Sequence, residues 1–175
     1  MYNSLKGSDI MKQIRIDDYK FSVDIEKTKE YYKTHSLCDC VCCRNYYKQI
    51  EQELPKLKEF LDDFGVDISK PDEIMSVENE GYIDYLNVDY TVCGNVINMS
   101  EYEIDIYDKL FLNVIVTEGF ASPNEQTGEY FTLSVTNIRL PWVLEVPIPT
   151  PIKIKAINKT KNNAFKSLKE KLFKK

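Results

Sequence analysis

The chain has one histidine and one tryptophan in 175 residues, and its only arginines are Arg15, Arg44 and Arg139. A single histidine restricts acid-base catalysis, and the sequence contains no glycine-rich phosphate loop, G-x-S-x-G elbow or H-E-x-x-H motif. Few arginines and a net charge of -5 disfavour nucleic-acid binding, because the guanidinium fork is the usual reader of bases and phosphates. These absences argue against most familiar enzyme classes and against a nucleic-acid partner.

Long apolar runs are also absent. No stretch approaches the roughly 20 residues that span a bilayer, and residues 1–21 carry charges throughout instead of a signal-peptide apolar segment. The sequence therefore predicts no transmembrane segment and a cytoplasmic protein. The five cysteines are an odd number, which fits a complete disulfide framework poorly. In a reducing cytosol such cysteines remain thiols or bind metal.

Length and a hydrophobic content of 43% predict a single domain. We expect a disordered N-terminus over residues 1–13, one domain over 14–150 and a basic tail over 151–175. From Lys153 to Lys175 nine lysines face one acid, Glu170, so this stretch carries about +8 and the remainder about -13. Apolar residues at helical spacing predict a basic C-terminal helix, which either packs on the acidic body or contacts a membrane surface; they are Ala164, Phe165, Leu168, Leu172 and Phe173.

Helices are expected in the first half of the chain. Residues 19–23 alternate as a strand, and Asp24 is a suitable N-cap for a helix from Ile25 towards Lys33. After the cysteines, an apolar stripe steps by three and four residues, as on one helix face: Tyr47, Ile50, Leu54, Leu57, Leu61 and Phe64. Pro55 predicts a kink or the first turn of a second segment, and Gly65 predicts the end.

Strands are expected in the second half. Before these strands, the sequence Pro71-Asp72-Glu73 favours a short helix within the loop of residues 66–80. From Gly81 the pattern changes to period two, which places Tyr82, Asp84, Leu86, Val88, Tyr90 and Val92 on one face of a strand, and Gly94-Asn95 predicts a turn. Residues 110–116 and 130–138 read as a hairpin with a long loop. Helices followed by strands indicate an α+β fold with an antiparallel sheet, on which a cysteine-rich, zinc-binding corner packs.

The densest chemistry lies between His35 and Arg44. The spacing H-x2-C-x-C-x2-C supplies four ligands of the kind that structural zinc prefers, namely His35, Cys38, Cys40 and Cys43. Cys42 or Cys93 could instead provide the fourth ligand, although a strand cysteine such as Cys93 is more often a small buried hydrophobe. Two other interpretations remain: Cys40 and Cys43 form a redox pair, or the cysteines have no chemical role.

A site saturated by four protein ligands has no position for water or substrate, so the zinc is predicted to be structural. The function predicted from the sequence is a zinc-stabilised cytosolic protein-binding module. The alternative is a thiol- or zinc-dependent enzyme in which Cys40 and Cys43 react and His35 assists.

A candidate partner surface lies along the strand after Gly81. Tyrosines and acids interleave there in a composition suited to gripping a basic protein, with Tyr82, Asp84, Tyr85, Asp89 and Tyr90 as the proposed contacts. Ordinary packing of a tyrosine-rich strand is the alternative interpretation.

The cysteine motif runs on into Arg44-Asn45-Tyr46, and Pro55, Phe64-Gly65-Val66-Asp67 and Lys70-Pro71-Asp72-Glu73 follow it. With these residues the chain resembles, over about residues 14–150, a family of small uncharacterised bacterial proteins common in Firmicutes. The resemblance supports the cysteine set. Relatives encoded near toxin genes imply an immunity or accessory role that neutralises a toxin partner.

Overall fold

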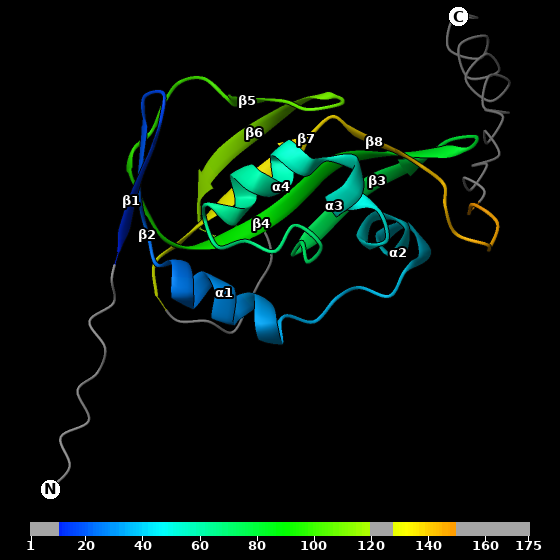
Figure 1. The fold of residues 1–175 in the computed structure, drawn as a ribbon, viewed down its shortest axis with the longest axis horizontal. Helices are drawn as coiled ribbons and strands as arrows, with labels where there is room; N and C mark the ends of the chain where they lie inside the picture. The colour runs from blue at the N-terminus through cyan, green and yellow to red at the C-terminus, as the bar shows by residue number, and fades with distance from the viewer. Residues whose placement is uncertain (1–10, 120–127, 150–175) are drawn as a thin grey trace, which may run out of the picture.

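The computed structural model describes residues 11–119 and 128–149, which form one antiparallel sheet and four short helices (Figure 1). The helices are α1 (Ile25–Thr34), α2 (Val41–Tyr47), α3 (Ile50–Glu53) and α4 (Pro55–Asp62). The strands are β1 (Lys12–Ile16), β2 (Tyr19–Val23), β3 (Glu73–Glu78), β4 (Tyr82–Asn98), β5 (Ile104–Tyr107), β6 (Phe111–Glu118), β7 (Tyr130–Thr136) and β8 (Ile138–Pro141). The α+β class and the antiparallel sheet are confirmed.

The 17-residue strand β4 organises the sheet, whose order is β1-β2-β4-β7-β6-β5 with β3 and β8 also paired to β4. Along one edge of β4, β3 pairs with residues 83–89 and β2 with residues 94–98. Along the other edge, β7 pairs with residues 88–93 and β8 with residues 82–85. The positions of these four strands in the sheet therefore depend on their register with β4.

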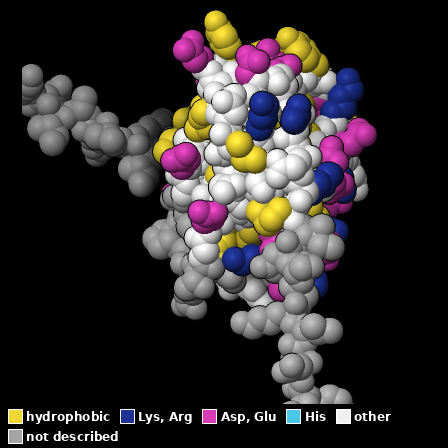
Figure 2. All heavy atoms as spheres, turned by 90° about the vertical axis from the view of Figure 1, so that its left-hand side faces the viewer, with side chains coloured by type: hydrophobic (Ala, Val, Ile, Leu, Met, Phe, Trp, Pro, Cys, Tyr) yellow, Lys and Arg dark blue, Asp and Glu magenta, His cyan; other side chains and the backbone are white. Residues whose placement is uncertain are grey.

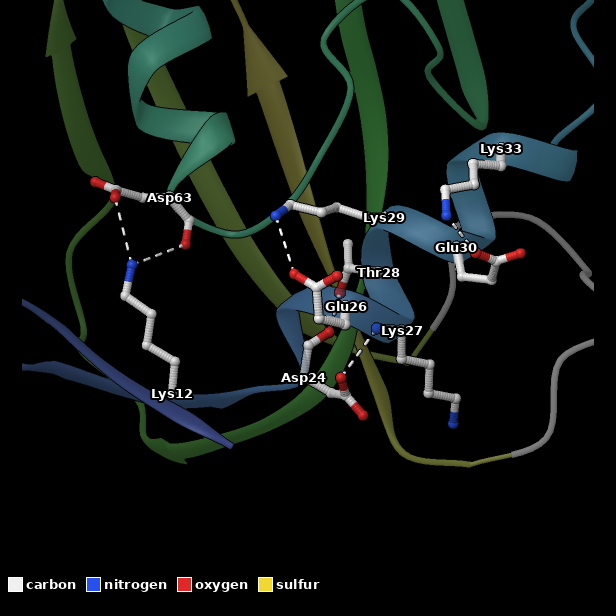
Figure 3. Close-up of polar contacts among 9 residues, drawn as sticks. All are labelled: Lys12, Asp24, Glu26, Lys27, Thr28, Lys29, Glu30, Lys33 and Asp63. Atoms are coloured by element: carbon white, nitrogen blue, oxygen red, sulfur yellow. Dashed lines mark hydrogen bonds and ion pairs between the residues drawn. The ribbon is translucent and has the colours of Figure 1, made fainter. Parts of the chain in front are cut away.

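Helix α1 lies beside the stretch of β4 that neither β2 nor β3 covers. The Thr91 carbonyl accepts a hydrogen bond from Tyr32 Oη at 2.9 Å, and the Cys93 N–H donates to Thr28 Oγ1 at 3.0 Å. Asp24 caps α1 by accepting from the Lys27 N–H at 2.9 Å (Figure 3), and its own N–H donates to the Cys93 carbonyl. Side chains of the helix thus bond to backbone groups at the edge of β4 that a neighbouring strand would otherwise pair. The predicted helix from Ile25 is confirmed.

Helices α3 and α4 cover one face of the sheet (Figure 1), and the core lies between them and β4, β6 and β7. Phe21 of β2 packs on Phe131 of β7 and on Phe64, with ring centroids 5.2 Å apart in both pairs. Most of the predicted apolar stripe is confirmed: Ile50, Leu54, Leu57, Leu61 and Phe64 are all buried. Tyr47 is half-buried and ends α2, so the stripe does not belong to a single helix.

Pro55 and Gly65 set helix boundaries, as predicted. Pro55 begins α4 after α3 has ended, so the proline divides the helix rather than kinking it. Gly65 has a φ of +77°, and beside it the Val66 N–H bonds back to the Leu61 carbonyl at 3.1 Å, which ends α4. The longest helix within residues 11–119 and 128–149, α1, has 10 residues, and none there is long and apolar enough to cross a membrane.

Ion pairs lie on the surface of α1 and between β1 and the end of α4. Lys12 of β1 reaches Asp63 at the end of α4, and Lys29 and Lys33 pair with acids one turn earlier on α1 (Figure 3). These side chains are largely exposed, so each pair contributes little to stability. On the side that carries β1 and β2, hydrophobic side chains are scattered among charged ones (Figure 2).

Two predictions in the first half of the chain are wrong. Residues 73–78 form strand β3 rather than a helix, because the Asp72 N–H bonds to the Asp89 carbonyl at 2.8 Å and starts the ladder with β4. Order also begins before residue 14, since Lys12 and Gln13 pair with β2. The rest of the predicted disordered segment, residues 1–10, and the predicted basic helix within residues 151–175 lie outside the described residues.

The predicted turn at Gly94-Asn95 is also wrong, because β4 continues through it to Asn98. Glycine is required at position 94 for another reason. The paired strand β2 lies so close to it that an added Cβ would be 2.1 Å from the Ser22 carbonyl oxygen. Its φ of +141° further disfavours a side chain.

We therefore expect Gly94→Ala to lower the free energy of unfolding by at least about 2 kcal/mol. Urea unfolding followed by circular dichroism measures the change. Gly81→Ala is the matched control, since Gly81 also has a positive φ but has no heavy atom within 4 Å of the position that an added Cβ would occupy. Equal losses in the two variants would show that conformation, not the approach of β2, sets the requirement.

Candidate metal centre

Helix α2 carries the last cysteines of the motif, and buried polar contacts fix it against the sheet. The Asn45 side chain donates to the Pro141 carbonyl at 3.1 Å and accepts from the Val143 N–H at 2.9 Å. The Tyr46 hydroxyl lies 2.5 Å from that of Tyr90, which in turn donates to the Ile68 carbonyl. Because these groups are buried and paired, the position of α2 is tightly specified.

Three cysteines converge at the start of α2. The sulfur atoms of Cys38, Cys40 and Cys43 all lie within 4.8 Å of one another. Cys40 is the N-cap of α2, and its sulfur accepts from the Cys43 N–H at 3.4 Å, while the sulfur of Cys38 accepts from the Cys40 N–H at 3.5 Å. This cluster could hold a metal ion, as the spacing predicted, and a soft thiolate set suits zinc.

Electrostatics oppose ionisation of Cys43 when no cation is bound. Burial, and then the neighbouring Cys40 and Cys38, raise the pKa of Cys43 well above its ordinary value. Burial also acts to raise the pKa of Cys40, but hydrogen bonds from the Cys43 backbone and from both neighbouring thiols outweigh it and lower that pKa. A bound divalent cation would reverse the repulsion and deprotonate the three thiols together.

Tyr47 belongs to the surroundings of the cluster and was not recognised as such from the sequence. Burial raises the pKa of its hydroxyl, and the charge of Cys43 and a hydrogen bond with it raise the pKa further. The signal was available in the sequence, because residues four apart share one helix face and Tyr47 is four residues after Cys43.

His35 does not join the three sulfurs in this structure. Its Nε2 lies 3.2 Å from the Pro71 carbonyl oxygen, and its Nδ1 lies 3.8 Å from Asp72 Oδ1. The ring packs against Tyr31, with centroids 5.2 Å apart, at the C-terminal end of α1. The predicted imidazole ligand is therefore placed on the Asp72 side of the loop, outside the group of sulfurs.

The two alternative ligands also lie elsewhere. The Cys42 thiol donates to Glu78 Oε1 of β3 at 3.3 Å, and burial and that carboxylate raise its pKa to about 11. Cys93 is buried on β4 beside Thr28 of α1, and burial raises its pKa to about 11. Glu78, which fixes Cys42, was not recognised from the sequence because it is distant along the chain.

Three of the five residues of the predicted partner surface on β4 are buried, namely Tyr85, Asp89 and Tyr90. A register shift between β3 and β4 leaves Leu86 as an extra residue, so the face reverses and Tyr85 joins Tyr90 in the core. Both tyrosines are 0% exposed, and Tyr85 Oη donates to the Cys42 carbonyl at 2.9 Å. Asp89 is buried as well, which leaves Tyr82 and Asp84 partly exposed; Arg139 covers this pair by stacking on Tyr82 and bonding to Asp84.

Asp89 gives a pH-dependent test of this burial. Burial raises its pKa, and Glu73 and Asp72 add to the effect, although hydrogen bonds from Ser134 and Asn87, both 2.5 Å, oppose it. The folded state therefore binds the proton more tightly than the unfolded state, and this group's contribution to stability is lost as pH rises from the unfolded pKa, near 3.9, through the folded pKa.

We expect Asp89→Asn, which keeps the accepting oxygen but cannot ionise, to gain stability relative to the wild type as pH rises from about 3 to 7. Urea unfolding at several pH values measures the difference. A difference that stays constant with pH would contradict the raised pKa.

Comparison of the chain with protein-family models, with curated proteins and with solved structures finds no match. The cysteine cluster and its surroundings therefore carry the functional argument.

Proposed function

We propose that the chain binds one zinc ion through Cys38, Cys40 and Cys43, and that this ion fastens the corner between α1 and α2. The observation that carries the proposal is the mutual approach of the three sulfurs within 4.8 Å. Thiolates are strong zinc ligands, and a reducing compartment such as the cytosol, where we place the protein, would keep them available.

The ion would stabilise a segment that otherwise has few fixed contacts of its own. Residues 35–40 contain no helix or strand, and Cys38 and Cys40 are exposed. The large core described above is made by other residues, so the ion supports one corner rather than the whole fold.

Thermal unfolding of the full-length protein at increasing free zinc tests the proposal. A ligand that binds only the folded state raises Tm with its concentration, by an amount set by the ratio of free zinc to Kd. We expect Tm to rise with zinc and to fall again when a chelator is added. A Tm that does not respond to zinc would overturn the proposed site.

A reactive thiol is the second candidate function. It rests on Cys40, which is exposed and has a lowered pKa, two properties of nucleophilic cysteines. The predicted assistance by His35 has little support, because that ring faces Pro71 and Asp72. Selective alkylation of Cys40 near neutral pH in zinc-loaded protein would favour this candidate, and complete protection until a chelator is added would favour the structural ion.

We further propose that the protein binds a basic partner, in its sharpest form a toxin neutralised by an immunity protein. Support comes from β3, where Met75 and Val77 are 61% and 45% exposed, and from the neighbouring Leu86, 47% exposed. Acidic Glu73 borders these apolar side chains, and Asp84, which already pairs with Arg139, lies opposite Val77. Residues before the tail carry about -13 in total, which complements a basic protein.

The product of the adjacent gene is the partner to test. If that gene encodes a basic toxin domain, we expect the two proteins to co-elute and Val77→Lys to abolish the complex. Thr117→Lys, at an exposed position of β6, should leave the complex intact. Equal effects of the two variants, or an adjacent product that does not bind, would contradict the partner proposal.

A further inference from the structure

The fourth ligand of the proposed zinc site has few candidates. The whole sequence contains one histidine and five cysteines, and all six lie within the described residues. Zinc usually takes four ligands. Three of them are accounted for by Cys38, Cys40 and Cys43, so only His35, Cys42 and Cys93 remain as imidazole or thiol ligands from this chain.

Each of the three has a partner elsewhere. His35 contacts Pro71 and Asp72, and its side chain is 15% exposed. Cys42 precedes Cys43 on α2 and donates to Glu78 on β3. Cys93 lies on β4, where its backbone bonds to Thr28 and Asp24 of α1. Among the described histidine, cysteine and acidic side chains, none completes the group of three sulfurs.

The surroundings of the cluster are open on one side. Cys38 and Cys40 are exposed, whereas Cys43 is buried, so a ligand from outside the chain can approach between the two exposed cysteines. Zinc with three thiolates already carries a net charge of -1. A neutral donor adds no further negative charge to this group of three sulfurs, which lie within 4.8 Å of one another.

We propose that a metal ion held by Cys38, Cys40 and Cys43 takes its fourth ligand from outside the chain, and that this ligand is a neutral nitrogen donor of the imidazole class. The inference rests on the proposed metal site and adds a binding position to it. It departs from the saturated H-x2-C-x-C-x2-C site expected from the sequence, because His35 stays with Asp72. The site would then recognise a ligand as well as stabilise a corner.

Cobalt(II) in place of zinc reports the ligands through its absorption spectrum. The full-length protein is loaded with cobalt(II), and imidazole is added as the probe, with 2-mercaptoethanol in a parallel titration. His35→Gln is the matched variant, since glutamine can still donate to the Pro71 carbonyl but is a poor metal ligand. Circular dichroism of the variant establishes that it is folded.

We expect wild type and His35→Gln to bind cobalt(II) with affinities within about tenfold of each other and to give the same spectrum. Imidazole should shift the ligand-field bands of both proteins saturably. An affinity loss beyond about 100-fold in His35→Gln would make His35 the fourth ligand. Either that result, or bands that respond only to the thiol or to neither probe, would overturn the inference but leave the metal site. Failure of cobalt(II) and zinc to bind at all would overturn the proposed function itself.

Discussion

Cys43→Ser is expected to weaken zinc binding by at least about 100-fold, whereas Cys42→Ser should leave it within about threefold of the wild type. The two cysteines are neighbours on α2, but only the sulfur of Cys43 lies with those of Cys38 and Cys40. Cys42 faces Glu78 instead, and a serine can make the same hydrogen bond there. Competition with a chromophoric chelator measures both affinities.

The pair of variants separates a specific site from general thiol affinity. If zinc simply followed the number of cysteines, both variants would lose the same amount. Equal losses would therefore contradict the assignment of Cys43, and a greater loss in Cys42→Ser would require α2 to be rotated relative to the structure.

Asp72→Ala has the largest effect that we expect on stability, a loss of about 3 kcal/mol in the free energy of unfolding. The Asp72 side chain is 2% exposed and joins three parts of the fold. Its carboxylate accepts from the Thr91 N–H of β4 at 2.7 Å and from the Tyr31 hydroxyl of α1, and it lies beside His35. Alanine would leave the buried donors of β4 and α1 without this acceptor.

Asp63→Ala is the control for Asp72→Ala. The Asp63 side chain is 69% exposed and pairs with Lys12 at 3.5 Å, so its loss should change stability by no more than about 0.5 kcal/mol. Urea unfolding of both variants gives the comparison. A loss in Asp72→Ala as small as that of the control would show that the carboxylate does not connect α1 to the open edge of β4.

Local signals in the sequence predicted the features that depend on neighbouring residues. Asp24, Pro55 and Gly65 set helix boundaries through capping, a missing N–H and a positive φ, and each acts within one helical turn. The three-cysteine cluster was predictable for the same reason, since six consecutive residues contain all three sulfurs.

Features that depend on distant residues were missed. The Pro71-Asp72-Glu73 pattern favours a helix locally, but pairing with β4 makes residues 73–78 a strand. The extra residue Leu86 reverses the face of β4, so strict alternation placed Tyr85 wrongly. His35 was assigned to zinc by spacing alone, and only the folded chain brings Asp72 to it.

Metal content of the full-length protein, purified without chelator and measured by elemental mass spectrometry, decides whether the cysteine cluster is a zinc site. We expect one equivalent of zinc per chain, with Cys38, Cys40 and Cys43 protected from alkylation until a chelator is added. Protein that is folded and free of metal, that takes up none when zinc is supplied, and whose Cys38 and Cys40 react freely would contradict the proposed site.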